Sequence, residues 1–266
     1  MLGIDSTLTS PGTTRFITAA RALLDRVEAQ ADAIGRVAVA CADAIAADGL
    51  VHLFGTGHSR IPVEEMFPRY GSYPGFNPIV ELSMTFHTQV VGSNGQRQAM
   101  FIERMPGLAE TILSNFEFLP TDVMMVFSAS GLSAVPIEMA TGARSRGLTV
   151  VAVTSVAQSM ASEPTHEAGR LLDNADIVLD LGTPAADALV TIDGLATPVA
   201  PGSTIAAVAL VNEIKAQTAE LLVARGAMPP VLTSAAVVGK EESARLFDSA
   251  YSEHARRYAR SLRGAS

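Results

Sequence analysis

The chain has 266 residues, of which 48% are hydrophobic, and its formal net charge is −8 at pH 7. This length supplies a full hydrophobic core. The acidic balance and the lack of a basic run argue against nucleic-acid binding, which needs cations to neutralise phosphates. The apolar run 205–211 is too short to span a membrane, and the N-terminus lacks the apolar stretch of a secretory signal. We therefore expect a cytoplasmic protein with neither a nucleic acid nor a membrane as partner.

The single cysteine, Cys41, lies among alanines and rules out an internal disulfide. No cluster of cysteine and histidine residues has the spacing of metal ligands, so we expect no metal. From residue 14 to residue 47, apolar residues recur at three- and four-residue spacing, which predicts one long N-terminal helix. The near-heptad spacing leaves two roles open for this helix, packing on its own domain or along a partner subunit.

The next part of the chain contains five continuous apolar runs of about five residues each, with helical stretches between them. Continuous rather than alternating runs are typical of strands buried on both faces of a parallel sheet. Strands that alternate with helices predict an α/β protein built as a three-layer sandwich. The predicted strands span residues 50–54, 78–82, 123–127, 148–153 and 177–181, and the predicted helices span residues 62–67, 105–119, 136–146 and 203–224.

We interpret residues 1–266 as a single domain with additions at both ends. An α/β core, residues 48–225, follows the N-terminal helix 14–47, and residues 226–266 form a C-terminal helical extension. Within that extension Arg256, Arg257 and Arg260 lie near acidic residues, so we expect them on a solvated helix face.

The first loop with unusual composition, residues 55–59, follows the first predicted strand. Gly55 and Gly57 allow backbone amides to approach a ligand closely, and Ser59 precedes a predicted helix whose positive end favours an anion. His58 lies inside this loop and can exchange a proton near neutral pH. A dinucleotide fingerprint needs a glycine at position 60, where this chain has Arg60, so a nicotinamide site is the weaker alternative and we expect no cofactor.

The second such loop, residues 128–133, follows the third predicted strand. Its hydroxyls and glycine, from Ser128, Ser130, Gly131 and Ser133, stand at a helix N-terminus and predict an anion cradle, although a serine-rich turn can also be a simple helix cap. No P-loop lysine is present, which argues against nucleoside triphosphate chemistry. Because ligands bind at the carboxyl ends of parallel strands, we expect both loops to form one site.

A third segment adds two more hydroxyls. Ser203 and Thr204 open the predicted helix 203–224 and either cap it or point into the same cleft.

The order of these motifs, GTGHS after one strand, SASGLS after another, then LTVVAVTS, ADIVLDLG and PGST, resembles the SIS (sugar isomerase) domain family over residues 30–225. The segments EEMFPRYG and PPVLTS resemble its phosphosugar-binding members, and sedoheptulose-7-phosphate isomerases and N-acetylmuramic acid 6-phosphate etherases look like more distant relatives. This resemblance implies a flavodoxin-like five-stranded parallel sheet with phosphate bound by the SxSGxS loop. It also implies a homodimer or homotetramer with sites at subunit interfaces. Asp187 occupies a place where members of this family often have a Gly-Asp pair, which implies that it orders the loop above the site.

Acid/base proton transfer between adjacent carbons needs a base and an acid. The resemblance to the sedoheptulose-phosphate isomerases implies a catalytic carboxylate at Glu65 or, less well matched, Glu64, although a solvated acidic pair in a first helical turn is the plainer interpretation. Those isomerases carry a histidine in the helix that begins here at Ser203; residues 203–213 contain none, which leaves Glu213 as a stand-in or as a surface acid. His87 is a further candidate to lie over the cleft.

The sequence as a whole favours a protein that binds a phosphorylated or otherwise anionic sugar and acts as an aldose–ketose isomerase. Two alternatives stay open at this point. One is a phosphosugar sensor without catalytic activity, although the single acidic N-terminal helix differs from the DNA-binding segment that such regulators carry. The other is a sugar-phosphate lyase or etherase.

Overall fold

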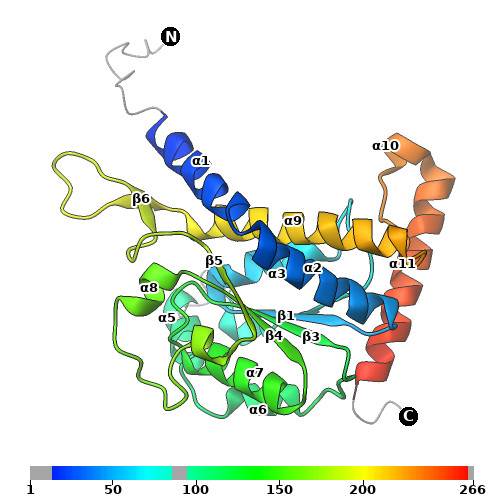
Figure 1. The fold of residues 1–266 in the computed structure, drawn as a ribbon, viewed down its shortest axis with the longest axis horizontal. Coiled ribbons are helices and arrows are strands. Elements are labelled where there is room, and N and C mark those ends of the chain that lie inside the picture. Colours follow the sequence, from blue (N-terminus) through cyan, green and yellow to red (C-terminus); the bar gives the residue numbers. More distant parts are fainter. Residues whose placement is uncertain (1–13, 86–94, 263–266) are drawn as a thin grey trace.

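The computed structural model describes residues 14–85 and 95–262 of the chain. Its centre is a five-stranded sheet in the order β2-β1-β3-β4-β5, in which every neighbouring pair is parallel (Figure 1). This topology confirms the predicted α/β class and the flavodoxin-like order of strands. The strands are β1 (Val51–Gly55), β2 (Phe76–Ile79), β3 (Val123–Phe127), β4 (Thr149–Thr154) and β5 (Ile177–Asp180).

The edge strand β2 begins two residues earlier than predicted. The sequence predicts residues 78–82, whereas the structure has Phe76–Ile79. Pairing with β1 decides these bounds, because Val51 lies opposite Phe76 in the parallel register. Pro78 lies inside the strand, which is tolerated because only one side of an edge strand needs hydrogen bonds to a neighbour.

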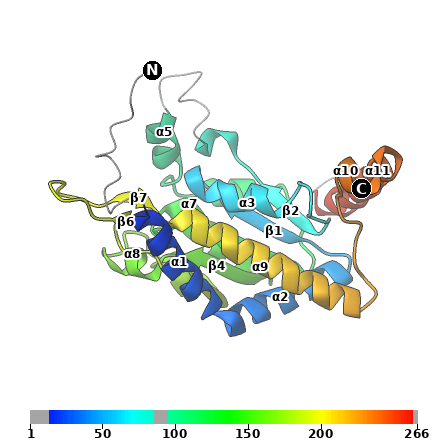
Figure 2. The same cartoon turned by 90° about the horizontal axis from the view of Figure 1, so that it is seen from above.

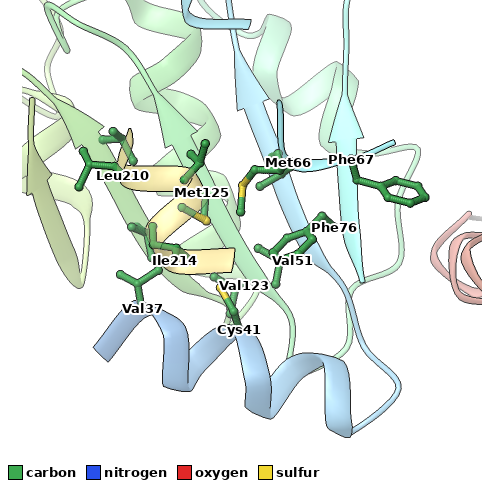
Figure 3. Packing of buried hydrophobic residues seen from close by; sticks show 14 of the residues in the cluster. Val37, Cys41, Val51, Met66, Phe67, Phe76, Val123, Met125, Leu210 and Ile214 are labelled. Carbon is green, nitrogen blue, oxygen red and sulfur yellow. The ribbon is translucent and has the colours of Figure 1, made fainter. Parts of the chain in front are cut away.

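Helices cover both faces of the sheet, which gives the three layers (Figures 1 and 2). Alternate strand residues point to opposite faces. Val123 and Met125 of β3 therefore belong to one hydrophobic core, beneath α2 and α9 (Figure 3), while Met124 and Val126 belong to the other, beneath α6 and α7. These helices are α2 (Ala31–Ala46), α3 (Ile61–Met66) and α9 (Ser203–Ala224) on the first face, and α6 (Leu108–Leu113) and α7 (Ala134–Ser145) on the second.

The prediction of one continuous helix over residues 14–47 is wrong. The chain forms α1 (Arg15–Glu28) and α2, with a break between them at Gln30. The Gln30 side chain explains the break, because its amide donates to the Asp180 carbonyl at 2.8 Å and accepts from the Asp180 amide at 2.7 Å. This two-way contact holds the turn against the end of β5, where a straight helix would pass by.

The predicted helix over residues 105–119 is also shorter in the structure, where α6 begins after Gly107 and ends at Leu113. Gly107 has a φ of +85°, which excludes it from a right-handed helix. Several short elements were not predicted. They are α5 (Gly95–Ile102), α8 (Val156–Met160), the antiparallel pair β6 (Ala188–Val190) and β7 (Val199–Pro201), and the 3-10 turns η2 (Gly57–Arg60), η3 (Leu82–Met84) and η4 (Leu171–Asn174).

The C-terminal extension forms α10 (Ala235–Val238) and α11 (Lys240–Ser261), which lies at one end of the sandwich (Figure 1). The expectation of a solvated face at Arg257 is wrong, because this side chain is only 6% exposed. Its guanidinium donates to the carbonyls of Ile45 and Gly49, both at 2.9 Å, and thereby ties α11 to the turn that follows α2. Arg256 and Arg260 are exposed as expected, and both pair with Asp48 in that turn.

Candidate functional site

The first loop turns sharply at the end of β1. Gly55 is the last residue of the strand, and a Cβ atom added there would lie 2.2 Å from the carbonyl oxygen of Ser59. The backbone can fold back on itself this closely only without a side chain at position 55. Gly57 has a φ of +54°, and the Ser59 amide donates to the Thr56 carbonyl at 2.9 Å to close the turn.

The second loop is held by its own serines. The Gly131 amide donates to Ser128 Oγ at 3.1 Å, and the Leu132 amide lies 3.5 Å from Ser130 Oγ. Gly131 has a φ of +62°, and a Cβ there would meet Thr154 Oγ1 at 2.9 Å, so glycine is required on both counts. The loop leads directly into α7, whose N-cap is Ser133.

Asp187 binds the start of α9. Its carboxylate accepts from the Ser203 amide at 2.8 Å and from the Ser203 hydroxyl at 2.7 Å. The Gly202 amide contacts the same carboxylate at 3.3 Å. Asp187 therefore caps the N-terminus of α9, an end that favours negative charge.

The three segments meet in one cavity at the carboxyl edge of the sheet, which we call the hydroxyl pocket. The cavity is small, and part of its space is open to solvent. Hydroxyl-bearing residues from all three segments line it, together with apolar residues at the ends of the strands. The lining residues are His58, Ser59, Pro62, Phe127, Ser128, Ala129, Val153, Leu181, Ser203, Thr204 and Ala207. Of the residues predicted to bind the ligand, the structure thus brings Ser59, Ser128, Ser203 and Thr204 together.

Glu103 was not predicted from the sequence as a site residue, and it connects the two loops through hydrogen bonds. Its carboxylate accepts from the Thr56 hydroxyl at 2.6 Å and from the Ser133 hydroxyl at 3.0 Å. Ser133 therefore faces an internal carboxylate and is not among the residues that line the hydroxyl pocket. Glu103 follows α5, in a stretch where no motif indicates function, so only the folded chain reveals this contact.

Glu64 and Glu65 lie on α3 and line a different cavity, which we call the α3 cavity, together with Arg69, Tyr70 and Tyr251. Glu64 is exposed and pairs with Arg60, whereas Glu65 is largely buried. Both cavities border the same short helix, because Pro62 of α3 lines the hydroxyl pocket and Glu65 stands three residues further along.

The carboxylate of Glu65 is held by polar partners. Asn212 on α9 donates to it at 3.0 Å, and Arg69 pairs with it on the other side. Partial burial raises the pKa of Glu65, but the hydrogen bonds from Asn212 and Arg69 and the charges of Arg69 and Lys215 outweigh it, so the pKa lies below its ordinary value. Glu65 is therefore ionised at neutral pH.

Lys215 on α9 contacts the backbone of α3. Its ammonium group donates to the Glu65 carbonyl at 3.0 Å and to Ser72 Oγ at 3.1 Å, and the residue is 6% exposed. Burial is the main cause that lowers the pKa of Lys215, partly offset by the charge of Glu65.

The structure does not bring Glu213 to the other candidate residues. Glu213 accepts from Gln217 at 2.8 Å and lines a cavity beside α1 and α2, whereas its neighbour Asn212 contacts Glu65. The spacing along α9 is the sequence feature that could have indicated this arrangement. Asn212 and Lys215 are three residues apart and lie on one face of the helix, whereas Glu213 lies on another. His87 lies outside the described residues.

Within residues 14–85 and 95–262, no group of three or more metal-ligating side chains comes together. Over the same residues, no helix is both long and apolar enough to cross a bilayer.

Residues 15–155, more than half of the chain, match the SIS domain family. The chain belongs to this family. A UPF0309 protein of Streptomyces griseus is 35% identical over 86% of this SIS-domain chain and 90% of its own length. The UPF0309 protein of Geobacillus kaustophilus is 33% identical, with 84% and 86% covered. Among solved structures, the sugar isomerase domain of an RpiR transcription factor from Sphaerobacter thermophilus has a TM-score of 0.43 and 15% identity, with 88% of this chain and 95% of that chain covered.

Proposed function

We propose that this SIS-domain protein binds an anionic sugar, phosphorylated or sulfonated, in the hydroxyl pocket. One observation carries the proposal: Ser59, Ser128 and Thr204 come from three separate segments and line one cavity at the carboxyl edge of the parallel sheet. Hydroxyl donors and helix N-termini at such an edge are suited to a tetrahedral anion. Apolar residues such as Phe127 and Leu181 complete the lining and lower the local polarity, which strengthens each polar contact.

The binding proposal predicts that Ser128→Ala and Thr204→Val each weaken the affinity for sugar phosphates by about tenfold or more, because a hydrogen bond to a charged group contributes about 1.5–3 kcal/mol. Calorimetric titration with hexose, heptose and amino-sugar phosphates measures this loss. Ser114→Ala, which removes an exposed hydroxyl at the end of α6, serves as the matched control and should bind as the wild type does. Unchanged affinity in both pocket variants would remove the hydroxyl pocket from the binding site.

We further propose that the bound sugar is isomerised by acid/base proton transfer with Glu65 as the base. The ionised Glu65 stands one turn of α3 beyond Pro62, which lines the hydroxyl pocket, so a sugar chain that extends along this helix approaches its carboxylate. His58, which also lines the pocket, is the candidate acid. Assembly as a homodimer or homotetramer, with a neighbouring subunit closing the site, belongs to the same proposal.

This chemistry predicts that a substrate sugar phosphate exchanges its C2 proton with solvent deuterium. Glu65→Gln should slow the exchange by about 10²–10⁴-fold, the usual contribution of a general base, while Glu64→Gln should have the smaller effect because that carboxylate is exposed. Proton NMR of each sugar in D₂O follows the exchange. Binding without exchange on any sugar of the panel would exclude isomerisation.

A sensor that binds without catalysis is the second candidate, and one observation favours it. Among the described residues that line the hydroxyl pocket there is no carboxylate, and Glu64 and Glu65 line a separate cavity. The same exchange experiment separates the two candidates, because a sensor binds the sugar phosphate and leaves its C2 proton in place.

A further inference from the structure

Glu103 determines the direction in which two hydroxyl groups of the candidate site donate their hydrogens. A carboxylate only accepts hydrogen bonds, so the hydroxyls of Thr56 and Ser133 must both donate to it, at 2.6 and 3.0 Å. An anionic group that extends from the hydroxyl pocket to these two residues would need the same hydrogens. Thr56 and Ser133 therefore cannot donate to a bound anion while they donate to Glu103.

The carboxylate also lies at the start of α7, a helix of 12 residues. Ser133 is the N-cap of this helix but does not cap it with its side chain, and the carbonyl of Glu103 accepts from the Val135 amide at 2.9 Å. The positive end of a helix favours a nearby negative charge. Glu103 thus supplies an internal anion on the side of the cradle where the sequence alone predicts the ligand's anion.

Ser128 differs from Ser133 in this respect. Its oxygen accepts from the Gly131 amide at 3.1 Å, and the residue lines the hydroxyl pocket, so its hydrogen can point to a ligand. Within the loop 128–133, the Ser133 hydroxyl is therefore bound to Glu103, whereas the Ser128 hydroxyl can still donate to a ligand.

We propose that Glu103 is a specificity-determining residue, an internal carboxylate that competes with a ligand's anionic group for the hydroxyls of Thr56 and Ser133. The inference rests on the proposed binding of an anionic sugar. Two negative groups at one set of donors repel each other, and each hydroxyl hydrogen serves only one of them. A tetrahedral anion must displace Glu103 to use the whole cradle, so this residue sets a lower affinity for simple anions than the hydroxyls alone would give.

The decisive variant is Glu103→Gln, which keeps the size and shape of the side chain and removes its charge. With inorganic phosphate as the probe, we expect calorimetry to show binding tighter by about tenfold, which corresponds to about 1.4 kcal/mol. Glu167→Gln, the same charge change at an exposed position, is the matched control and should leave phosphate affinity within about twofold of the wild type, because exposed charges at a distance are screened by salt.

Ser133→Ala tests whether the gain comes from the contested hydroxyl. Added to Glu103→Gln, it should remove most of the gain in phosphate affinity, because the donor that Glu103 releases is then absent. If Glu103→Gln does not fold, Glu103→Asp replaces it: the shorter side chain withdraws the carboxylate from Thr56 and Ser133 and should also tighten phosphate binding.

Competition by Glu103 is overturned if neither Glu103 variant binds phosphate more tightly than the wild type, or if the gain persists in full with Ser133→Ala. These outcomes differ from a failure of the proposed function. Loss of binding in Ser128→Ala with no gain in Glu103→Gln would reject the competition and keep the anion site. No phosphate or sugar-phosphate binding to any of these proteins would reject both.

Discussion

Gly55→Ala is expected to abolish sugar-phosphate binding and to destabilise the fold by at least about 3 kcal/mol, the upper part of the range for overpacked sites. The new Cβ would lie 2.2 Å from the Ser59 carbonyl oxygen and 2.7 Å from its carbonyl carbon. Both are backbone atoms, so no change of side-chain rotamer relieves the clash. The turn must open, and Ser59 and His58 then leave the positions from which they line the hydroxyl pocket.

Urea denaturation and calorimetric titration on the same protein measure both effects. Gly35→Ala in α2 is the control, because its added Cβ would meet only Gln217 Oε1, at 3.8 Å. That variant should gain about 0.5–1 kcal/mol of stability from the higher helix propensity of alanine, and it should bind as the wild type does. A Gly55→Ala protein with normal stability and affinity would show that the tight turn is not required.

Asp122→Ala is expected to cost about 3–5 kcal/mol in the free energy of unfolding, as loss of one member of a buried polar network does. Asp122 is 2% exposed and precedes β3 at the amino edge of the sheet. It accepts from the amides of Leu50 and Leu119 at 2.7 and 2.8 Å, and His52 Nε2 lies 3.3 Å from it. Alanine would leave the buried Leu50 amide and His52 ring without this acceptor, and the part-buried Leu119 amide would lose it as well.

Asp176→Ala supplies the matched comparison for urea denaturation. Asp176 also accepts from the start of a strand, at the Val150 amide of β4, at 2.8 Å. Its side chain is 38% exposed, so water can replace it, and the loss in the free energy of unfolding should stay below about 1 kcal/mol. Because Asp122 lies at the sheet edge opposite the hydroxyl pocket, the folded fraction of its variant should bind sugar phosphates normally. Equal losses in the two variants would contradict the role of burial.

The sheet was the part of the fold most open to prediction from sequence. The run 123–127 matches β3 residue for residue, and the runs 50–54 and 148–153 differ from β1 and β4 by one residue. A central parallel strand is buried on both faces, so its composition alone marks it. The helix 203–224 matches α9 for a related reason, since a long apolar run that begins after Pro201 and Gly202 marks it locally.

Long-range side-chain contacts could not be predicted in this way. Gln30 breaks the N-terminal helix because of a partner 150 residues away, and Arg257 is buried because of carbonyls more than 200 residues before it. The sequence around a polar side chain does not indicate which distant backbone group that side chain will hydrogen-bond in the folded protein.

The same division holds at the candidate site. Strand ends and loop composition are local properties, so the glycine- and hydroxyl-rich loops after β1 and β3 could be located from the sequence. Parallel topology then places both loops on one edge of the sheet. Three other features of the site became visible only in the folded chain. The Ser133 hydroxyl donates to Glu103, Asn212 rather than Glu213 contacts Glu65, and Glu65 lines a cavity apart from the hydroxyl pocket. Those outcomes depend on how helices α3, α5 and α9 pack against the sheet, which no local pattern encodes.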